Sequence, residues 1–198
     1  MTTPDPVAEK RRRLKQLLLE RASAGPDQPK ATLPRVDGSG PARLSLYQER
    51  LWLADQLQPD GTAYTIPFAF RLRGPLDRPA FEAAIGEIVR RHETLRTTFA
   101  SGAEGPTQVV HPPKSISIEA IDLTSVPPGE REQAGWDTAE RLMAAPFDLQ
   151  QGPLFRPTLI PLGPDDHIFV MVFHHIISDG WSIHVFFREL TAHYRALI

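Results

Sequence analysis

Residues 168–173 read IFVMVF, a run of six apolar residues that leads directly into two histidines. A run of this length and composition predicts a buried β-strand, which other strands and helices of the chain must cover. Side chains alternate along a strand, so Val172 and His174 share one face while Phe173 and His175 share the other. Only one of the two histidines can therefore face a given site.

A turn and a helix are predicted after this strand. Asp179 and Gly180 are a turn signal, and apolar residues then recur at helical spacing. These residues are Ile183, Phe186, Phe187, Leu190, Tyr194 and Leu197. Strand-to-helix turns project side chains into clefts, where an imidazole with a pKa of about 6.5 can accept a proton or hold an amine. Asp179 needs a partner if it is buried, and Gly180 permits a close approach or a backbone conformation that a side chain would forbid.

Strand and helix patterns also alternate through the preceding part of the chain. Helices are predicted at residues 45–57, from Asp77 to about residue 90, and at about residues 130–144. Strands are predicted at residues 64–74, 108–111, 116–121 and 153–160. Asp77 is a good N-cap, and Pro79 is tolerated in the first turn of the helix that follows. This order predicts an α/β (α+β) fold in which helices cover a mixed β-sheet.

The first forty residues have a different composition. Residues 1–22 predict a short basic amphipathic helix, and residues 23–41 form a linker rich in proline and glycine, so the folded domain is expected at residues 42–198. The simplest interpretation of the helix is a solvated leader, and a helix that docks on a partner is the main alternative. Membrane attachment is disfavoured, because four leucine-class contacts make a weak anchor.

Several classes of function are disfavoured by what the sequence lacks. A net charge of −2 gives no concentrated basic surface for nucleic acid, and zero cysteines exclude disulfides, thiolate nucleophiles and cysteine-based zinc sites. No apolar run reaches the roughly 18 residues of a membrane span, and no signal-peptide core is present. Adjacent histidines are an awkward metal chelate, and the chain has neither a G-x-S-x-G elbow nor a phosphate-cradling glycine loop. These features suit a cytoplasmic protein without metal, nucleic-acid or membrane partners.

Three blocks of sequence resemble, in order, the motifs of one known family. HHIISDG at residues 174–180 is similar to the HHxxxDG motif of condensation domains in nonribosomal peptide synthetases, which belong to the chloramphenicol acetyltransferase-like superfamily. SLYQERLWLADQL at residues 45–57 and RHETLRTTF at residues 91–99 resemble the first and second motifs of that family. The resemblance implies the N-terminal lobe of a two-lobe domain, most like the subtype that joins an L-configured donor to an L-configured acceptor.

The resemblance also implies roles for individual residues. The catalytic candidates within the HHxxxDG block are His175, His174, Asp179 and Gly180. His175 matches the second histidine of the motif, which is expected to accept the proton of a reacting amine or to position that amine. Asp179 and Arg91 are expected to form a structural ion pair that holds the turn, with Arg96 as the second candidate partner.

The reaction implied by the resemblance is peptide-bond formation between two thioesters. The amine of an acceptor aminoacyl group would attack a donor thioester, each carried on the 4′-phosphopantetheine arm of a carrier protein. Because the thioester is already activated, the domain itself is expected to bind no cofactor and no metal. Trp181 and Ser182 are weaker candidates for lining the substrate tunnel, since packing and capping in the first turn of a helix explain them equally well.

The implied partners are the upstream and downstream carrier proteins, the C-terminal lobe that is missing from this chain, and a docking partner for the N-terminal helix. Without that second lobe the chain alone is expected to be inactive. Two other interpretations stay open: a non-catalytic lobe or docking fragment, and a free-standing acyltransferase with the shared HxxxD core that acts on a small alcohol or amine.

Overall fold

The computed structural model describes residues 16, 40, 42–102 and 105–198, and every structural statement below concerns these residues. The chain divides into two compact units, residues 1–39 and residues 40–198. The N-terminal helix and the linker predicted from the sequence lie outside the described residues, apart from Gln16 and Gly40. The fold described here is therefore that of the second unit.

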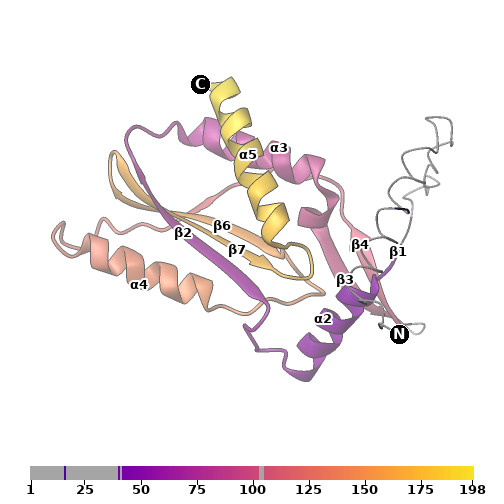
Figure 1. The fold of residues 1–198 in the computed structure, drawn as a ribbon. Helices are drawn as coiled ribbons and strands as arrows, with labels where there is room; N and C mark the ends of the chain where they lie inside the picture. The colour runs from indigo at the N-terminus through magenta and orange to yellow at the C-terminus, as the bar shows by residue number, and fades with distance from the viewer. Residues whose placement is uncertain (1–15, 17–39, 41, 103–104) are drawn as a thin grey trace, which may run out of the picture. The chain divides into compact units, whose positions relative to one another are not determined.

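A four-stranded mixed sheet forms the centre of this unit (Figure 1). Its strands, in spatial order, are β2 (Thr65–Arg73), β7 (Asp166–His174), β6 (Phe155–Gly163) and β5 (Glu119–Ala120). β7 pairs antiparallel with β2 and with β6, whereas β5 runs parallel to β6. Each residue from Ile168 to Phe173 is at most 2% exposed. The buried strand predicted from the apolar run is thus confirmed as an inner strand of the sheet.

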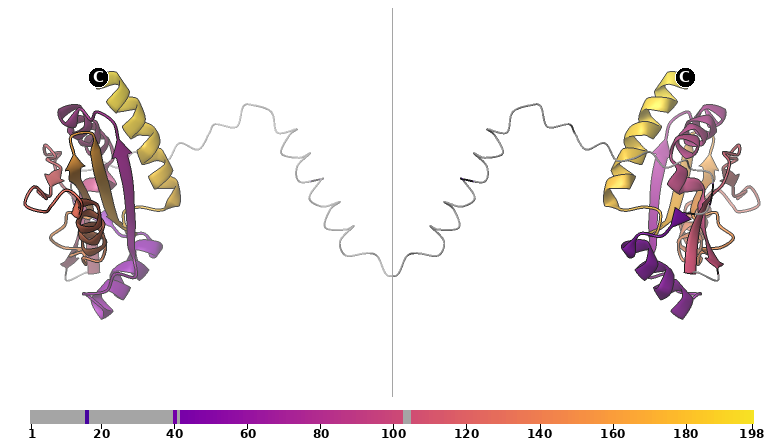
Figure 2. Two further views of the ribbon diagram at one scale, coloured as in Figure 1. Left: turned by 90° about the vertical axis from the view of Figure 1, so that its left-hand side faces the viewer. Right: turned by 90° about the vertical axis from the view of Figure 1, so that its right-hand side faces the viewer.

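Helices cover both faces of this sheet. α3 (Arg78–Arg91) and α5 (Gly180–Leu197) lie on the face of Phe169 and Phe173, where the ring of Phe169 is 4.9 Å from that of Phe81. α4 (Arg131–Met143) lies on the opposite face, and Figure 2 shows the sheet between its helices. A Cβ atom on Gly135 of α4 would stand 2.7 Å from Cδ2 of Leu162 and 3.1 Å from Cδ1 of Ile168, so any larger residue would force these side chains to shift.

The start of α3 agrees with the sequence prediction. The side chain of Asp77 accepts a hydrogen bond from the Ala80 backbone N–H at 2.9 Å, and proline stands in the first turn. The buried positions of this helix then follow helical spacing: Ala80, Phe81, Ala84, Ile85, Ile88 and Val89. A good cap and one continuous apolar face are what made this helix predictable.

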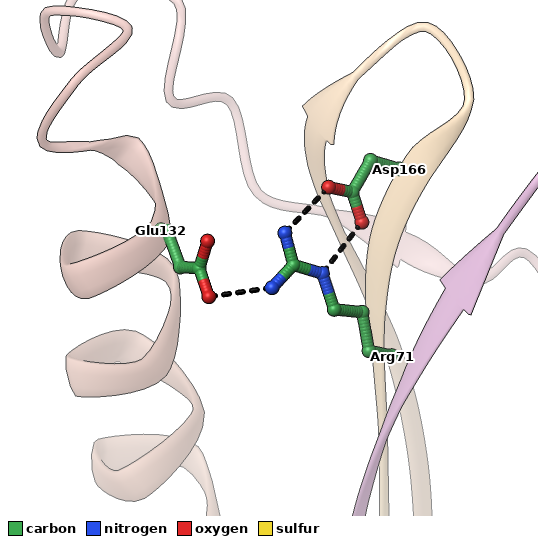
Figure 3. Close-up of polar contacts among 3 residues, drawn as sticks. All are labelled: Arg71, Glu132 and Asp166. Atoms are coloured by element: carbon green, nitrogen blue, oxygen red, sulfur yellow. Dashed lines mark hydrogen bonds and ion pairs between the residues drawn. The ribbon is translucent and has the colours of Figure 1, made fainter.

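An arginine links the outer strand β2 to both β7 and α4 (Figure 3). Arg71 donates to the two carboxylate oxygens of Asp166 at 2.9 and 2.7 Å, and to Oε1 of Glu132 at 2.5 Å. The hydrogen bonds to Asp166, and after them the one to Glu132, raise the pKa of Arg71. The two-pronged contact with Asp166 fixes the guanidinium geometrically, as arginine–carboxylate pairs commonly do.

A second, three-stranded antiparallel sheet stands beside the first, although the sequence predicted only one sheet. Its strands, in spatial order, are β1 (Ala42–Arg43), β4 (Gly105–Val110) and β3 (Thr97–Gly102). β3 was missed because its sequence, TTFASG, has neither a continuous apolar run nor clean alternation. Phe99 of β3 is fully buried and its backbone N–H donates to the Leu149 carbonyl at 2.8 Å, so tertiary contacts define this strand.

Two further elements complete the unit. α2 (Leu46–Leu57) begins at the N-cap Ser45, whose side chain and that of Gln48 form a reciprocal capping box. A single turn of 3₁₀ helix, η1 (Glu93–Arg96), joins α3 to β3. Over the part of the chain that the structure describes, no helix has the length and apolar character to cross a membrane.

Candidate active site

The turn between β7 and α5 carries the predicted site, and backbone hydrogen bonds hold it at three points. The backbone N–H of His174 donates to the Leu154 carbonyl at 3.0 Å, and that of His175 donates to the Tyr64 carbonyl at 2.8 Å. The Ile177 N–H then donates to the His174 carbonyl at 3.1 Å and closes the turn. The backbone of both histidines is therefore fixed by residues next to β6 and β2.

His174 is locked into the turn by its own ring. The side chain is only 5% exposed, and its Nδ1 accepts a hydrogen bond from the Ile176 backbone N–H at 3.1 Å. A backbone N–H can only donate, so Nδ1 carries the lone pair and a neutral ring carries its proton on Nε2. Burial, and secondarily the charge of His175, lowers the pKa of His174 to about 4. His174 is thus neutral at physiological pH and already engaged.

The ring of His175 has different surroundings. It is half-buried and meets the ring of Tyr47 in α2 edge-on, with 5.9 Å between the centroids. Its Nδ1 is buried and has no hydrogen-bond partner among the described residues. His174 by contrast faces Phe147, at 5.9 Å between ring centroids. The two histidines therefore face different neighbours, as the alternation along the strand predicted.

Asp179 is the N-cap of α5 rather than half of an ion pair. Its Oδ1 accepts from the Ser182 backbone N–H at 2.8 Å and from the Ser182 hydroxyl at 2.7 Å. These two hydrogen bonds, side chain first and backbone second, lower the pKa of Asp179. The residue is exposed, so its charge is solvated and needs no buried cation.

The predicted pairing of Asp179 with Arg91 or Arg96 is therefore not what the structure shows. Arg91, at the end of α3, lies 3.6 Å from Oε1 of Glu189 in α5. Arg96 instead contacts Glu93 at 3.3 Å and donates to the His111 carbonyl. Among the described residues both arginines thus contact acceptors other than Asp179, and the sequence had no feature that identified Glu189 as the partner of Arg91.

Gly180 opens α5 and leaves space in front of the turn. Its backbone has no positive φ, and a Cβ atom placed on it would meet nothing within 4 Å. The expected need for an unusual backbone conformation is therefore not observed. No described neighbour demands a glycine here, so any close approach that it permits must come from a molecule or segment outside the described residues.

A cavity of about 210 Å³ lies between the turn, the first turns of α5 and the segment around η1. Its lining residues are Ile88, His92, Thr94, Leu95, Phe173, Ile177, Ser178, Trp181, Ser182, Ile183, Val185 and Phe186. Trp181 and Ser182, the candidates for tunnel lining, both belong to this wall, and Trp181 is 75% exposed. His175 does not line it. The hydroxyl of Ser178 is buried at this wall without a partner among the described residues.

Contacts join the first block to the third, and the second block to the helix that follows the third. Gln48 of the first block donates from Nε2 to the Ile176 carbonyl in the turn at 3.5 Å. His92 of the second block places its Nε2 2.7 Å from Oε2 of Glu189 in α5. Tyr47, Gln48 and His92 were not chosen from the sequence, although each lies inside a block that was. Among the described residues there is no group of three or more histidine or acidic side chains that could hold a metal ion.

Comparison with known proteins agrees with this geometry. A model of the condensation domain family matches residues 39–198. The chain belongs to the condensation-domain family. One of the linear gramicidin synthase proteins of Brevibacillus parabrevis is 44% identical to this condensation domain over 178 residues, which cover 90% of the chain and 2% of that protein. Chondramide synthase of Chondromyces crocatus is 44% identical over 153 residues, which cover 77% of the chain and 4% of that protein.

Solved condensation domains have the same fold. The starter condensation domain of rhizomide synthetase is 30% identical with a TM-score of 0.72, and the match covers 80% of this chain and 38% of that one. The first condensation domain of the calcium-dependent antibiotic synthetase, in complex with a substrate analogue, is 31% identical with a TM-score of 0.70 and the same coverage. This chain therefore spans well under half of a solved condensation domain and corresponds to one lobe of the chloramphenicol acetyltransferase-like fold.

Proposed function

We propose that this condensation domain forms peptide bonds in nonribosomal peptide synthesis. A carrier-bound aminoacyl amine attacks an upstream carrier-bound acyl or peptidyl thioester. The amine nitrogen bonds to the thioester carbonyl carbon, the carbon–sulfur bond breaks, the amine loses a proton and the leaving thiolate gains one. The observation that carries this proposal is the contrast between the two histidines: the ring of His174 is buried with its Nδ1 occupied, whereas the ring of His175 is only half-buried and lies beside Tyr47.

We assign to His175 the role of interacting with the attacking amine. A neutral imidazole can accept the proton that the attacking amine loses, or hold the amine in line with the carbonyl, and such proton transfer is typically worth about 10²–10⁴ in rate. His174 cannot do this, because its Nδ1 is occupied and the ring is buried. The cavity walled by Trp181 and Ser182 supplies part of the substrate tunnel beside the turn that carries His175, although His175 itself does not line it.

The substrates reach the site on 4′-phosphopantetheine arms of an upstream and a downstream carrier protein. The domain itself needs no cofactor, because the thioester supplies the activation. The second lobe forms the remainder of the tunnel, and the N-terminal helix docks on a partner or lies solvated. Similarity of the RHETLRTTF and HHIISDGWS blocks supports the subtype that joins an L-configured donor to an L-configured acceptor, in a cytoplasmic synthetase.

The test replaces His175 in the complete condensation domain, with both carrier proteins loaded. His175→Ala should lower the rate of dipeptidyl-carrier formation by about 10²–10⁴, with circular dichroism and melting temperature unchanged. His193→Ala, at the far end of α5, is the matched control and should keep full turnover.

Turnover within a few-fold of wild type in His175→Ala would remove His175 from this role. An intact domain that leaves the carrier-bound amine unreacted but acylates a small free alcohol or amine would favour the free-standing acyltransferase. An intact domain that does neither would be a non-catalytic lobe or docking fragment.

A further inference from the structure

We infer that Arg156 and Phe147 are positioning residues that act through His174 to hold the turn presenting His175. Neither residue lies in the three blocks that resemble the family motifs. Both belong to the α4-facing side of the sheet, away from the cavity at α5, and neither is among the residues that line that cavity. They reach the turn through a continuous series of contacts.

The first contact fixes the guanidinium of Arg156 in β6. It donates to the Ala145 carbonyl at 2.6 Å and to the Pro146 carbonyl at 3.2 Å, just beyond the end of α4. Its Cζ atom then lies 3.9 Å from the centroid of the Phe147 ring. A planar cation over an aromatic face is attracted by the ring quadrupole, and the two carbonyls set its plane. Arg156 therefore holds Phe147 in one orientation.

The second contact passes from Phe147 to His174. Phe147 is 6% exposed, and its ring meets that of His174 at 84° with 5.9 Å between the centroids. This edge-to-face packing restricts rotation of the imidazole about its χ2 bond. Restriction matters here, because only one ring orientation places the lone pair of Nδ1 opposite the Ile176 N–H.

The third contact is that hydrogen bond. Ile176 lies directly after His175, so its N–H fixes the peptide that follows the proposed catalytic residue. If the His174 ring turned over, a carbon would face the Ile176 N–H and leave a buried donor unpaired. The peptide on the other side of His175 is already fixed, through the hydrogen bond to Tyr64. This hydrogen bond depends on the orientation of the His174 ring, which can rotate. Arg156 and Phe147 thus stabilise the backbone after His175 by holding that ring in place.

The predicted ion pair with Asp179 would have made Arg91 or Arg96 the arginine that supports the turn. In this inference the supporting arginine is Arg156, on the opposite face of the sheet. It acts by orienting two rings and not by neutralising a carboxylate. This inference rests on the proposed function only in its last step, the identity of His175 as the group being presented. The contacts themselves can be tested without any turnover.

The test is nuclear magnetic resonance of the complete condensation domain labelled with ¹⁵N-histidine at neutral pH, combined with hydrogen exchange of the Ile176 amide. Wild type should show His174 as a single tautomer with the proton on Nε2. Arg156→Ala and Phe147→Leu should each give a mixture of tautomers and at least tenfold faster exchange at Ile176. Arg188→Ala is the matched control, because the Arg188 side chain is exposed on α5 and forms no ion pair with a described residue.

Arg156→Lys separates orientation from charge. Lysine keeps the charge but cannot stack a planar fork on Phe147 while donating to two carbonyls, so we expect it to behave like Arg156→Ala. Full restoration of the wild-type tautomer and exchange by lysine would overturn the stacking argument. Wild-type signals in both Arg156→Ala and Phe147→Leu would overturn the whole inference. If Arg156→Ala does not fold, Phe147→Leu and Arg156→Lys decide in its place, since they retain most of the buried volume.

The same variants connect the inference to turnover in the complete domain. Arg156→Ala should lower kcat for condensation at least tenfold while KM for the loaded carriers changes less than threefold. A change confined to KM would overturn the positioning role. If the wild-type domain does not condense carrier-bound substrates at all, the proposed function fails, and the tautomer and exchange measurements still decide the role of Arg156 and Phe147.

Discussion

Two adjacent histidines at the end of β7 acquire opposite properties because their rings lie in different surroundings, His174 against Phe147 and His175 against Tyr47. His174 points into the protein, accepts a backbone hydrogen bond and has a pKa lowered to about 4. His175 lies against Tyr47 at the edge of the turn, and its Nδ1 has no partner among the described residues. The buried ring of His174 maintains the turn, and the half-buried ring of His175 is the one to which the proposed function assigns the chemistry.

This difference predicts how stability depends on pH. In the unfolded chain His174 binds a proton below pH about 6.5, but in the folded protein it does so only near pH 4. The unfolded state therefore binds more protons as the pH falls, and the folded state loses stability between these two values. Lowering the pH from 7 to 5 should lower the free energy of unfolding by roughly 2 kcal/mol through this residue alone. Urea unfolding at the two pH values measures it.

His174→Asn is the control for this prediction. The amide oxygen of asparagine can accept the Ile176 N–H in place of Nδ1, but asparagine does not titrate. The variant should therefore lose less stability than wild type between pH 7 and pH 5, by about the contribution of His174. Equal losses in both proteins would mean that His174 is protonated in the folded state at much higher pH than the structure indicates.

At the scale of whole elements, α5 is capped at its start by Asp179. Asp179→Ala should lower the free energy of unfolding by about 1 kcal/mol, the usual cost of losing an N-cap, because the Ser182 N–H loses its acceptor. Asp179→Asn should keep most of that stability, since asparagine caps helices equally well. Denaturant unfolding of the two variants is the measurement.

A double-mutant cycle with Arg91→Ala shows whether Asp179 also forms an ion pair. Because Arg91 contacts Glu189 and not Asp179, the two substitutions should act additively, within about 0.5 kcal/mol. A buried ion pair would instead cost about 3–5 kcal/mol on loss of either partner and would give a large coupling energy. Such coupling would restore the ion pair that the family resemblance implied.

Elements with a local signal could be predicted from the sequence. β7 was predictable from its apolar run, and α3 from the Asp77 cap and its periodic apolar face. β3 could not be predicted, because its identity depends on pairing with β4 and on the contact of Phe99 with the Leu149 backbone. β1, with only two residues, has no local signal at all.

The same division holds for the candidate site. His175, Asp179, Trp181 and Ser182 could be named together from the sequence, because they lie on one short turn and its following helix, and their roles stay a prediction. The predicted partner of Arg91 was wrong, and neither Phe147 nor Arg156 was predicted to belong to the site. Each of these contacts depends on which elements approach one another in space. A single sequence contains no record of such long-range pairs.

At the scale of the whole molecule, the chain matches only part of a solved condensation domain. It covers only 38% of the solved condensation domains that it matches. Several large apolar side chains are exposed, namely Leu46, Leu53 and Leu57 of α2 and Trp181 of α5. Exposed apolar surface of this kind marks an interaction site or promotes self-association. We therefore expect the isolated chain to associate with itself in solution.

The isolated chain is also expected to lack condensation activity. Holding two reactants in the correct geometry is worth effective molarities of about 10⁵–10⁸ M, and that requires a wall on each side of the two substrate arms. An imidazole contributes a rate factor of only about 10²–10⁴, so His175 on a single wall cannot replace the lost alignment.

Residues 1–198 assayed with loaded donor and acceptor carriers should give no product above background. Adding the remainder of the condensation domain in trans should restore turnover, and His175→Ala should abolish the restored rate. Histidine-dependent turnover by a monomeric 198-residue chain would contradict the two-lobe argument and would favour a free-standing acyltransferase.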